Sequence, residues 1–331
     1  MAEKVTITTG ARLHLALIDL NGSLGRIDGS IGLAVNNPKI SIDATPSIDV
    51  SANKHQELVA SAVHKLQQHF GVEYGLRVTF RRDYPAHVGL GSTTQILLSI
   101  AKAYCLLYDL PGTARDLARV VGRGGTSGIG VAAFASGGFI LDAGHSFGPK
   151  KQKTTFLPSR ASTAPPPPVI LRKPFPANWT IDLVVPPIGS GLSGQNEINF
   201  FQTVCPISLE ETQHLCHIVF SQIIPGILEH DIEAFSTGVN SLAYIGFKKH
   251  EVSRQPQELR SLIEHLHKRM GNLASLGMSS FGPTLYFIYD TAHLTRIVAK
   301  VRERLQSFSR THDALFVTTR GRNSGATATV Q

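Results

Sequence analysis

Residues Pro85–Gln95 read PAHVGLGSTTQ and are the most informative segment of the sequence. It lies between Leu76–Phe80, whose alternating apolar and polar residues predict a strand, and Thr93–Tyr108, whose apolar periodicity predicts a helix. Gly89 and Gly91 allow the connecting backbone to turn tightly and to approach a ligand closely. The sequence therefore predicts a strand, a glycine-bearing loop and a helix in direct succession.

Hydroxyl side chains follow these glycines at Ser92, Thr93 and Thr94. At a helix N-terminus, unpaired N–H groups and the helix dipole together favour an anion. The loop is not a Walker A loop, because no Gly-Lys-Ser/Thr follows, and it is not a Rossmann fingerprint, because Thr94 replaces the third glycine. Two interpretations stay open here: the loop binds a phosphate, or Ser92 merely caps the helix. The residues that we predict to bind phosphate are Gly89, Leu90, Gly91, Ser92, Thr93 and Thr94.

The composition of the chain excludes several classes of protein. Of its 331 residues, 42% are hydrophobic and 17% are charged, which excludes a disordered or fibrous chain. A net charge of +8 favours anionic partners such as nucleic acid, acidic membranes, or phosphorylated and carboxylated small molecules. The basic clusters Lys150–Lys153 and Lys248–Lys249 lack the interleaved aromatic residues of nucleic-acid surfaces. We therefore expect a phosphate-bearing metabolite as the partner, and no nucleic acid.

Cysteine content and hydropathy indicate where the protein works. Cys105, Cys205 and Cys216 are too few and too widely spaced for a disulfide framework. No apolar run approaches the ~18–20 residues that cross a bilayer, and the N-terminus lacks a signal-peptide pattern. We therefore expect a soluble cytoplasmic protein without a membrane partner. Its length suggests one large domain or two ordinary ones.

Periodicity places further elements along the chain. Alternation or short apolar runs predict strands at Val5–Thr9, Lys39–Asp43, Gly138–Leu141, Ile181–Val185, Thr284–Tyr289 and Ala314–Thr318. Helical spacing predicts helices at Gln56–Phe70, Thr113–Val121, Ser208–Glu229 with an interruption at Pro225, Pro256–Met270 and His293–Phe308. The C-terminal half is therefore α+β with grouped helices, and the small, polar tail Asn323–Gln331 is predicted to fray.

The segment Ser146–Pro176 differs from its surroundings. It holds a cluster of lysines and then Pro165–Pro168, and it has little apolar periodicity. Because four consecutive prolines cannot join a helix or a central strand, we predict a surface connection. We place the domain boundary here, with an N-terminal domain over 1–160 and a C-terminal domain over 161–331. A long inserted loop inside a single domain is the alternative.

Three motifs agree in order and spacing with those of a known superfamily. Pro85–Gln95 resembles the phosphate-binding motif of the GHMP superfamily, which includes galactokinase, homoserine kinase, mevalonate kinase and phosphomevalonate kinase. Thr9–Leu15 resembles its N-terminal motif, and Leu276–Pro283 occupies the place of its C-terminal glycine-rich motif. The resemblance implies an α+β, two-domain GHMP-kinase-type fold, with a ribosomal-protein-S5-like N-terminal domain, a ferredoxin-like C-terminal domain and an active site in the cleft between them.

Two departures from the kinase pattern disfavour phosphoryl transfer. Kinases of this superfamily carry an aspartate in a Pro-Ser-Gly-x-Asp stretch, where its carboxylate can activate the attacking hydroxyl. In the corresponding run, Gly125–Gly130, a glycine occupies that position and can neither accept a proton nor hold a metal. In addition, Arg12–Leu15 contains no lysine. An ATP-dependent small-molecule kinase that uses another acid stays as an alternative, and so does a non-catalytic metabolite-binding homologue.

One branch of the superfamily, the β-ribofuranosylaminobenzene 5′-phosphate synthases of methanopterin biosynthesis, is similar to this sequence throughout. The segments that carry the resemblance are Ala11–Leu20, Gly22–Arg26, Arg123–Gly130, Gly137–His145 and Gly191–Gly194, with Glu197 and Phe201. The resemblance implies decarboxylating phosphoribosyl transfer from 5-phosphoribosyl 1-pyrophosphate (PRPP) to 4-hydroxybenzoate or 4-aminobenzoate, with Mg²⁺ assisting. The implied products are a C-riboside 5′-phosphate, carbon dioxide and pyrophosphate, and the family also implies a homodimer.

In such a reaction the enzyme chiefly positions two anions and stabilises separating charges. Asp19 is the first candidate for a Mg²⁺ ligand, and Ser92 is the second. Arg26 is a candidate bidentate clamp for phosphate or carboxylate. Arg12 and His14, two apart on an extended segment, share a face and complete the catalytic candidates. The alternatives are a simple turn at Asp19, an exposed loop arginine at Arg26, and structural roles for Arg12 and His14.

Other polar residues are weaker candidates. Those predicted to bind substrate from glycine-rich loops of the cleft are Gly125, Thr126, Ser127 and Ser193. Asp142 and His145 follow a buried strand and are candidates for supporting the site or a metal. His214 and His217 would share a helix face, but no nearby cysteine or carboxylate completes a metal site, so we favour partly buried helix residues.

Overall fold

The two longest strands among the described residues form the spine of the protein. The computed structural model describes residues 2–185 and 194–331. β1 (Val5–Asp19) and β2 (Arg26–Ser47) pair antiparallel, with Val5 opposite Ala44 at one end and Asp19 opposite Asp28 at the other. The register shifts between Gly10 and Ala11 and again just after His14, so the strand bends where its polar residues lie.

A mixed layer of strands and helices, mostly from the N-terminal half of the chain, packs on this spine. The further strands are β3 (Ser51–Ala52), β4 (Gly75–Arg82), β5 (Phe139–Asp142), β6 (His145–Ser146), β7 (Val169–Lys173) and β12 (Thr327–Val330). The sheet runs β12-β1-β2-β4-β3, while β5 and β6 pair with β2 and β7 pairs with β5. The helices are α1 (Gln56–Phe70), α2 (Ser92–Leu107), α3 (Ala114–Val120) and α4 (Ile129–Ala135). Because α2 contacts both β1 and β2, the loop before it is held against the spine.

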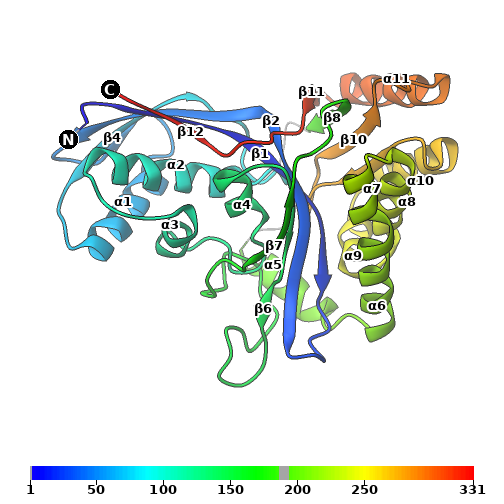
Figure 1. Cartoon of the computed structure of the whole chain (residues 1–331), viewed down its shortest axis with the longest axis horizontal. Coiled ribbons are helices and arrows are strands. Elements are labelled where there is room, and N and C mark those ends of the chain that lie inside the picture. The colour runs from blue at the N-terminus through cyan, green and yellow to red at the C-terminus, as the bar shows by residue number, and fades with distance from the viewer. Residues whose placement is uncertain (1, 186–193) are drawn as a thin grey trace.

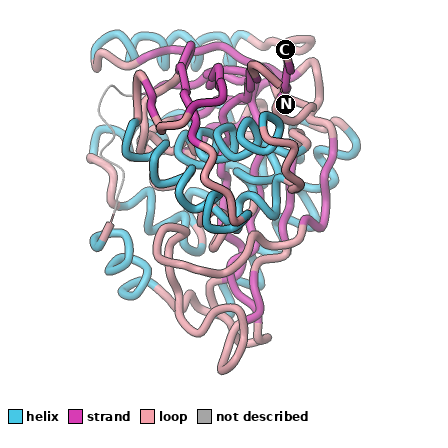
Figure 2. Tube along the Cα trace, turned by 90° about the vertical axis from the view of Figure 1, so that its left-hand side faces the viewer, coloured by secondary structure: helices cyan, strands magenta, loops and turns pink. Residues whose placement is uncertain are grey.

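The C-terminal half contains a separate antiparallel sheet. Its strands are β8 (Trp179–Val185), β9 (Ser275–Met278), β10 (Leu285–Asp290) and β11 (Leu315–Arg320), in the order β11-β8-β10-β9. The helices are α5 (Gln195–Val204), α6 (Leu209–Ile218), α7 (Ile224–Glu229), α8 (Ile232–Ser241), α9 (Gly246–Ser253), α10 (Gln257–Met270) and α11 (Arg296–Thr311). In Figure 1 the spine strands run between α1–α4 on one side and α6–α10 on the other, and Figure 2 shows the strands from a perpendicular direction.

A continuous apolar core joins the two halves. The Phe139 ring of β5 lies 6.4 Å from the Phe235 ring of α8, centroid to centroid. The Phe235 ring in turn lies 5.1 Å from the ring system of Trp179 at the start of β8, and Phe175 packs edge-on against Trp179. All four side chains are essentially buried. The two sheets are therefore held together by apolar packing rather than by a flexible linker.

Most of the predicted elements are confirmed, but β1 and β2 are much longer than the predicted strands Val5–Thr9 and Lys39–Asp43. The interruption near Pro225 takes the form of a π-helical turn, Val219–Ile223, after which Pro225 occupies the first turn of α7, where it needs no N–H partner. The predicted fraying of Asn323–Gln331 is wrong. Its residues form β12 and pair with β1, with Val330 opposite Val5, because the exposed edge of β1 offers unpaired backbone groups.

The predicted surface connection Ser146–Pro176 also needs correction. Lys153 is only 5% exposed, and Pro166 and Pro167 are buried. Within this segment, β7 pairs with β5 and so belongs to the first sheet. The first sheet therefore takes strands from both sides of the proposed 160/161 boundary, and a division after Lys173 would keep β7 with its partner strand.

Among the residues that the structure describes, no helix is both long and apolar enough to span a membrane.

Candidate functional site

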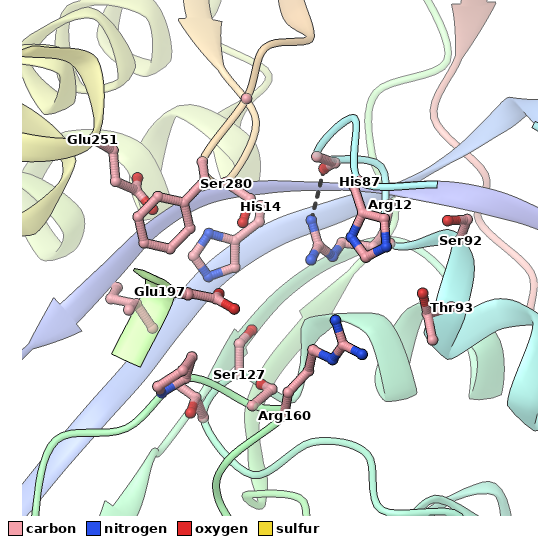
Figure 3. Close-up of a pocket in the computed structure, with 18 of the residues that line it drawn as sticks. Arg12, His14, His87, Ser92, Thr93, Ser127, Arg160, Glu197, Glu251 and Ser280 are labelled. Atoms are coloured by element: carbon pink, nitrogen blue, oxygen red, sulfur yellow. Dashed lines mark hydrogen bonds between the residues drawn. The ribbon is translucent and has the colours of Figure 1, made fainter. Parts of the chain in front are cut away.

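A cavity opens where the two halves meet. Residues of Thr9–Leu15, Pro85–Gln95 and Leu276–Pro283, the three motifs noted in the sequence, line it. It lies beside β1, the start of α2, α5 and α9 and is shown in Figure 3. Its lining residues are Arg12, His14, Leu17, His87, Gly89, Gly91, Ser92, Thr93, Arg123, Thr126, Ser127, Pro158, Ser159, Arg160, Glu197, Phe201, Glu251, Ser280, Phe281 and Gly282.

The loop before α2 is shaped by glycines in the left-handed region. Gly89 has a φ of 85° and Gly91 a φ of 74°. A Cβ atom on Gly89 would lie 2.2 Å from the carbonyl oxygen of Ser279, so no larger residue fits without movement. The N-cap position of α2 is Gly91, which has no side chain to cap the helix, and Ser92 is already the first helical residue. The capping interpretation of Ser92 is therefore wrong, and the N–H groups at this helix start face the cavity without a side-chain cap.

Hydrogen bonds tie the three motifs to one another. The Arg12 guanidinium donates to the Gly89 carbonyl (2.9 Å), the contact drawn as a dashed line in Figure 3. The Ser279 hydroxyl donates to the same carbonyl (2.7 Å) and accepts from the His14 backbone N–H (3.0 Å). The Ser280 N–H donates to the His14 carbonyl (3.0 Å). The strand, the glycine loop and the C-terminal loop thus form one rigid wall of the cavity.

One side of the cavity is cationic. Arg12, Arg123 and Arg160 all line it, and Figure 3 shows Arg12 and Arg160 near Ser92 and Thr93 at the start of α2. Burial lowers the pKa of Arg12 to about 10, which still leaves the group charged at neutral pH. This side of the cavity is suited to bind phosphate or carboxylate groups.

The carboxylates of the cavity differ in their partners. Glu251 forms a buried ion pair with Lys248, which also donates to the carbonyl of Ser280 (3.0 Å). Burial raises the pKa of Glu251 and lowers that of Lys248, while their mutual attraction opposes both shifts. Glu197, by contrast, has no ion-pair partner among the described residues. Burial raises the pKa of Glu197 to about 7, although Arg160 and Arg123 act in the opposite direction.

His14 is a neutral polar group beside this carboxylate. Its side chain is almost completely buried, and its Nδ1 has no hydrogen-bond partner among the described residues. Burial, followed by the charges of Arg12 and Lys248, holds the pKa of His14 well below its usual range. A buried, unpartnered nitrogen in a cavity wall is a ready hydrogen-bonding group for a ligand.

The structure brings together most of the substrate-binding residues predicted from sequence. Those that line the cavity are Arg12, His14, Gly89, Gly91, Ser92, Thr93, Thr126 and Ser127. Leu90 and Thr94 are buried behind it, and Thr94 accepts a hydrogen bond from Arg123 (2.9 Å). Gly125 packs against Ser162 rather than facing the cavity. Ser193 lies outside the described residues.

Asp19 and Arg26 do not reach the cavity. The Asp19 carboxylate accepts from the N–H groups of Asn21 (2.9 Å) and Gly22 (3.1 Å), which is the simple turn between β1 and β2. The Arg26 guanidinium donates to the carbonyls of Ala143 and Gly144 and fastens the loop after β5. The cavity therefore excludes the sequence-based candidates for metal ligand and anion clamp, because local hydrogen bonds already occupy both side chains.

Asp142 and His145 serve the framework around the site. Asp142 accepts from the N–H groups of Gly128 and Gly144 (2.9 Å each), and burial raises its pKa to about 6 against these hydrogen bonds. The Nδ1 of His145 lies 2.6 Å from the Asp28 carboxylate, and its Nε2 donates to the carbonyl of Pro165 (2.9 Å). Both residues thus hold loops in place.

The two helix histidines also carry no metal site. His214 and His217 lie on α6 along a separate surface hollow. Within residues 2–185 and 194–331, no group of three His, Cys, Asp or Glu side chains could hold a metal ion.

Sequence reasoning missed three charged residues of the cavity, Arg160, Glu197 and Glu251, of which Glu197 was named only for the family resemblance. Arg160 belongs to the segment predicted to be a surface connection, and nothing in its neighbourhood signals a site. Glu251 stands three residues after Lys248, a spacing that puts both on one helix face, but the lysines suggested only a basic cluster.

Family comparisons agree with this architecture. Residues 57–138 match the family described as GHMP kinases N terminal domain, and residues 223–307 match GHMP kinases C terminal. A solved structure of homoserine kinase from Cytophaga hutchinsonii has a TM-score of 0.67 with 15% identity, covering 99% of this chain and 98% of that one. At this identity the likeness concerns the fold, and it confirms the predicted two-domain α+β class.

Relatives of higher identity are also found. The chain is 42% identical over 301 residues to a β-ribofuranosylphenol 5′-phosphate synthase of Methanothermobacter thermautotrophicus, covering 88% of this chain and 90% of the relative. It is 40% identical over 289 residues to the synthase of the same name from Archaeoglobus fulgidus, covering 86% and 88%.

Proposed function

Because the chain belongs to the β-ribofuranosylphenol 5′-phosphate synthase family of the GHMP superfamily, we propose that its cavity condenses PRPP with 4-hydroxybenzoate. The protein is an enzyme of the pentosyltransferase type. The ring carbon that bears the carboxylate attacks the anomeric carbon of ribose, pyrophosphate leaves, and carbon dioxide follows. The observation that carries the proposal is the 42% identity to a synthase over 301 residues.

The cationic side of the cavity supports binding of the PRPP phosphate groups at that side. As pyrophosphate departs, it gains negative charge and the ribose ring becomes positive. The uncapped start of α2 and the guanidinium groups of Arg12 and Arg123 stand ready to bind the departing anion. Since these groups are fixed before the reaction, they need little reorganisation during it. We assign the PRPP phosphates to this side.

The position of Gly130 argues against a kinase. It lies in α4 and has no side chain that could accept a proton, and a Cβ atom there would be 3.2 Å from the Cγ2 of Thr94, a tight contact. The Gly130 carbonyl also accepts from the side-chain amide of Gln95 (2.8 Å). A phosphoribosyl transfer needs no base at this position, because its nucleophile is a ring carbon.

The protein donors for Mg²⁺ in the cavity are few. Asp19 lies outside the cavity, Glu251 is paired with Lys248, and Glu197 lies on the opposite side of the cavity from Ser92, whose hydroxyl oxygen is beside the cationic groups. We propose that Mg²⁺ enters as the complex with PRPP, with Ser92 as its protein contact, because Mg²⁺ often binds through substrate phosphates and water. When bound, it would neutralise charge on the leaving pyrophosphate.

The acceptor and the assembly complete the proposal. The relatives are named for a phenol product, which corresponds to 4-hydroxybenzoate rather than 4-aminobenzoate. On the same resemblance we propose that the protein is cytoplasmic and forms a homodimer. Light scattering tests the dimer, because one chain has a mass of 35.8 kDa and a dimer has twice that mass.

A decarboxylation assay tests the proposed reaction. Purified protein is mixed with carboxyl-labelled 4-hydroxybenzoate, PRPP and Mg²⁺, and 4-aminobenzoate is run in parallel. We expect labelled carbon dioxide only when all components are present. Absence of release by folded protein that instead phosphorylates a small molecule with ATP would return the assignment to a kinase, and binding without any turnover would indicate a non-catalytic homologue.

A further inference from the structure

Helix α5 presents a carboxylate and an aromatic ring to the same part of the cavity. Glu197 and Phe201 are four residues apart, so they share one face of the helix, and both line the cavity. The Phe281 ring, from the loop after β9, lies 6.2 Å from the Phe201 ring, centroid to centroid. Leu17 of β1 adds a further apolar side chain. This part of the cavity is an apolar slot beside two carboxylates, of which Glu251 is paired with Lys248 and Glu197 has no ion-pair partner in the described structure.

The slot lies away from the start of α2, where Ser92 and Thr93 line the cavity. In Figure 3, Glu197 and His14 lie on one side, while Ser92 and Thr93 lie on the other. If PRPP occupies the cationic side, an aromatic acceptor that attacks the anomeric carbon points its opposite ring position toward the slot. In 4-hydroxybenzoate that opposite position carries the hydroxyl group.

We propose that Glu197 is the base that accepts the proton of the acceptor's para-hydroxyl group, while Phe201 and Phe281 flank its ring; this rests on the proposed function. A phenolate is a far stronger carbon nucleophile at its para position than a neutral phenol. A base at the hydroxyl therefore activates the ring carbon that bears the carboxylate, at the other end of the molecule.

The electron flow balances without a further reactant. The hydroxyl O–H bond breaks and its proton goes to the Glu197 carboxylate. The oxygen electron pair moves through the ring to form the bond to the anomeric carbon, whose bond to pyrophosphate breaks with its electrons on pyrophosphate. Carbon dioxide then leaves the resulting cyclohexadienone, and its bonding pair restores the aromatic phenolate. The phenolate recovers the proton from Glu197.

Two properties of the surroundings agree with this role. The charged or titratable groups that face Glu197 are Arg160, Arg123, Glu251 and the neighbouring His14. None of them forms an ion pair with Glu197 in the described structure, so its carboxylate is available. Its pKa of about 7, raised by burial, suits proton transfer near neutral pH. The unpartnered Nδ1 of His14 is a second sign that this end of the cavity receives a polar ligand group.

The experiment compares acceptors in one variant, Glu197→Gln, which keeps the shape and removes the base. With 4-hydroxybenzoate we expect kcat to fall roughly 10²–10⁴-fold. With 4-aminobenzoate, whose nitrogen donates electrons without losing a proton, and with 3-fluoro-4-hydroxybenzoate, whose hydroxyl is more acidic, the loss should be at least tenfold smaller. Glu210→Gln, an exposed position of α6, is the matched control and should behave as the parent enzyme.

The pH profile is the second readout. In the parent enzyme, kcat/KM for 4-hydroxybenzoate should rise with pH through about 7, because Glu197 must be ionised to accept a proton. This limb should vanish in Glu197→Gln. Equal losses with 4-hydroxybenzoate and its fluorinated analogue, or an unchanged limb in the variant, would overturn the proposal.

The two proposals fail in different ways. If the parent enzyme releases no carbon dioxide from either benzoate, the proposed function is wrong. If the parent enzyme is active and Glu197→Gln treats all acceptors alike, only the role of Glu197 is wrong, and a misfolded variant is recognised by its lost thermal transition.

Discussion

Single glycine residues decide how closely two backbone segments can pack. Gly89 and Gly71 both have a positive φ, but their surroundings differ. A Cβ atom on Gly89 would meet the Ser279 carbonyl oxygen at 2.2 Å, whereas a Cβ atom on Gly71 would meet nothing within 4 Å. This contrast separates the conformational role of a glycine from its role in close packing.

We predict that Gly71→Ala lowers the free energy of unfolding by about 1–2 kcal/mol, the cost of a left-handed alanine. Gly89→Ala should cost about 1–3 kcal/mol more, because it also crowds the Ser279 carbonyl. Urea unfolding measures both values. Gly89→Ala should also raise the KM for PRPP, while Gly71→Ala should leave it unchanged. Similar stability losses in the two variants would contradict the packing argument.

At the scale of elements, a buried charge cluster holds the loop that carries Arg160. Lys153 donates to the Asp28 carboxylate (2.9 Å), to the Thr126 hydroxyl (3.3 Å) and to the Leu157 carbonyl (3.2 Å). His145 completes the partners of Asp28. The loop after Leu157 then supplies part of the cavity wall, so Lys153 and Asp28, which do not line the cavity, position Arg160.

We predict that Lys153→Met lowers the free energy of unfolding by about 3–5 kcal/mol, because the Asp28 carboxylate would be left buried without its lysine partner. Because the loop with Arg160 would loosen, the KM for PRPP should rise more than kcat falls. The matched control is Lys268→Met, which removes the exposed pair with Glu264 and should leave stability nearly unchanged. Equal thermal stability of the two variants would refute the role of the cluster.

At the scale of the whole molecule, the continuous core predicts cooperative unfolding. Phe139 of the first half packs on Phe235 of the second, and the surrounding apolar residues of both halves form one cluster. We therefore predict a single calorimetric transition whose van't Hoff and calorimetric enthalpies agree. Saturating PRPP should move this one transition upward, because the half that binds it does not unfold apart from the other half. Two separate transitions, or a shift of only part of one, would contradict the prediction.

The parts of the site that depend on turn glycines, helix starts and strand alternation can be predicted from the sequence. Gly89, Gly91 and Ser92 form a recognisable loop because turn glycines and a helix start are specified by neighbouring residues. Arg12 and His14 were placed by strand alternation and do line the cavity. Asp19 shows the limit of the method, since an aspartate before Asn-Gly fits a turn and a metal ligand equally well until its hydrogen bonds are seen.

The α+β class, most helices and strands, and the family can be predicted without a structure, because periodicity, glycine placement and motif spacing are properties of neighbouring residues. Which charges meet in the cavity depends on tertiary packing. Arg12, Arg160 and Glu197 come from segments far apart in the chain, and the packing of the two sheets brings them together. Burial in that shared cavity raises the pKa of Glu197, and no local pattern encodes the burial of a side chain by distant segments.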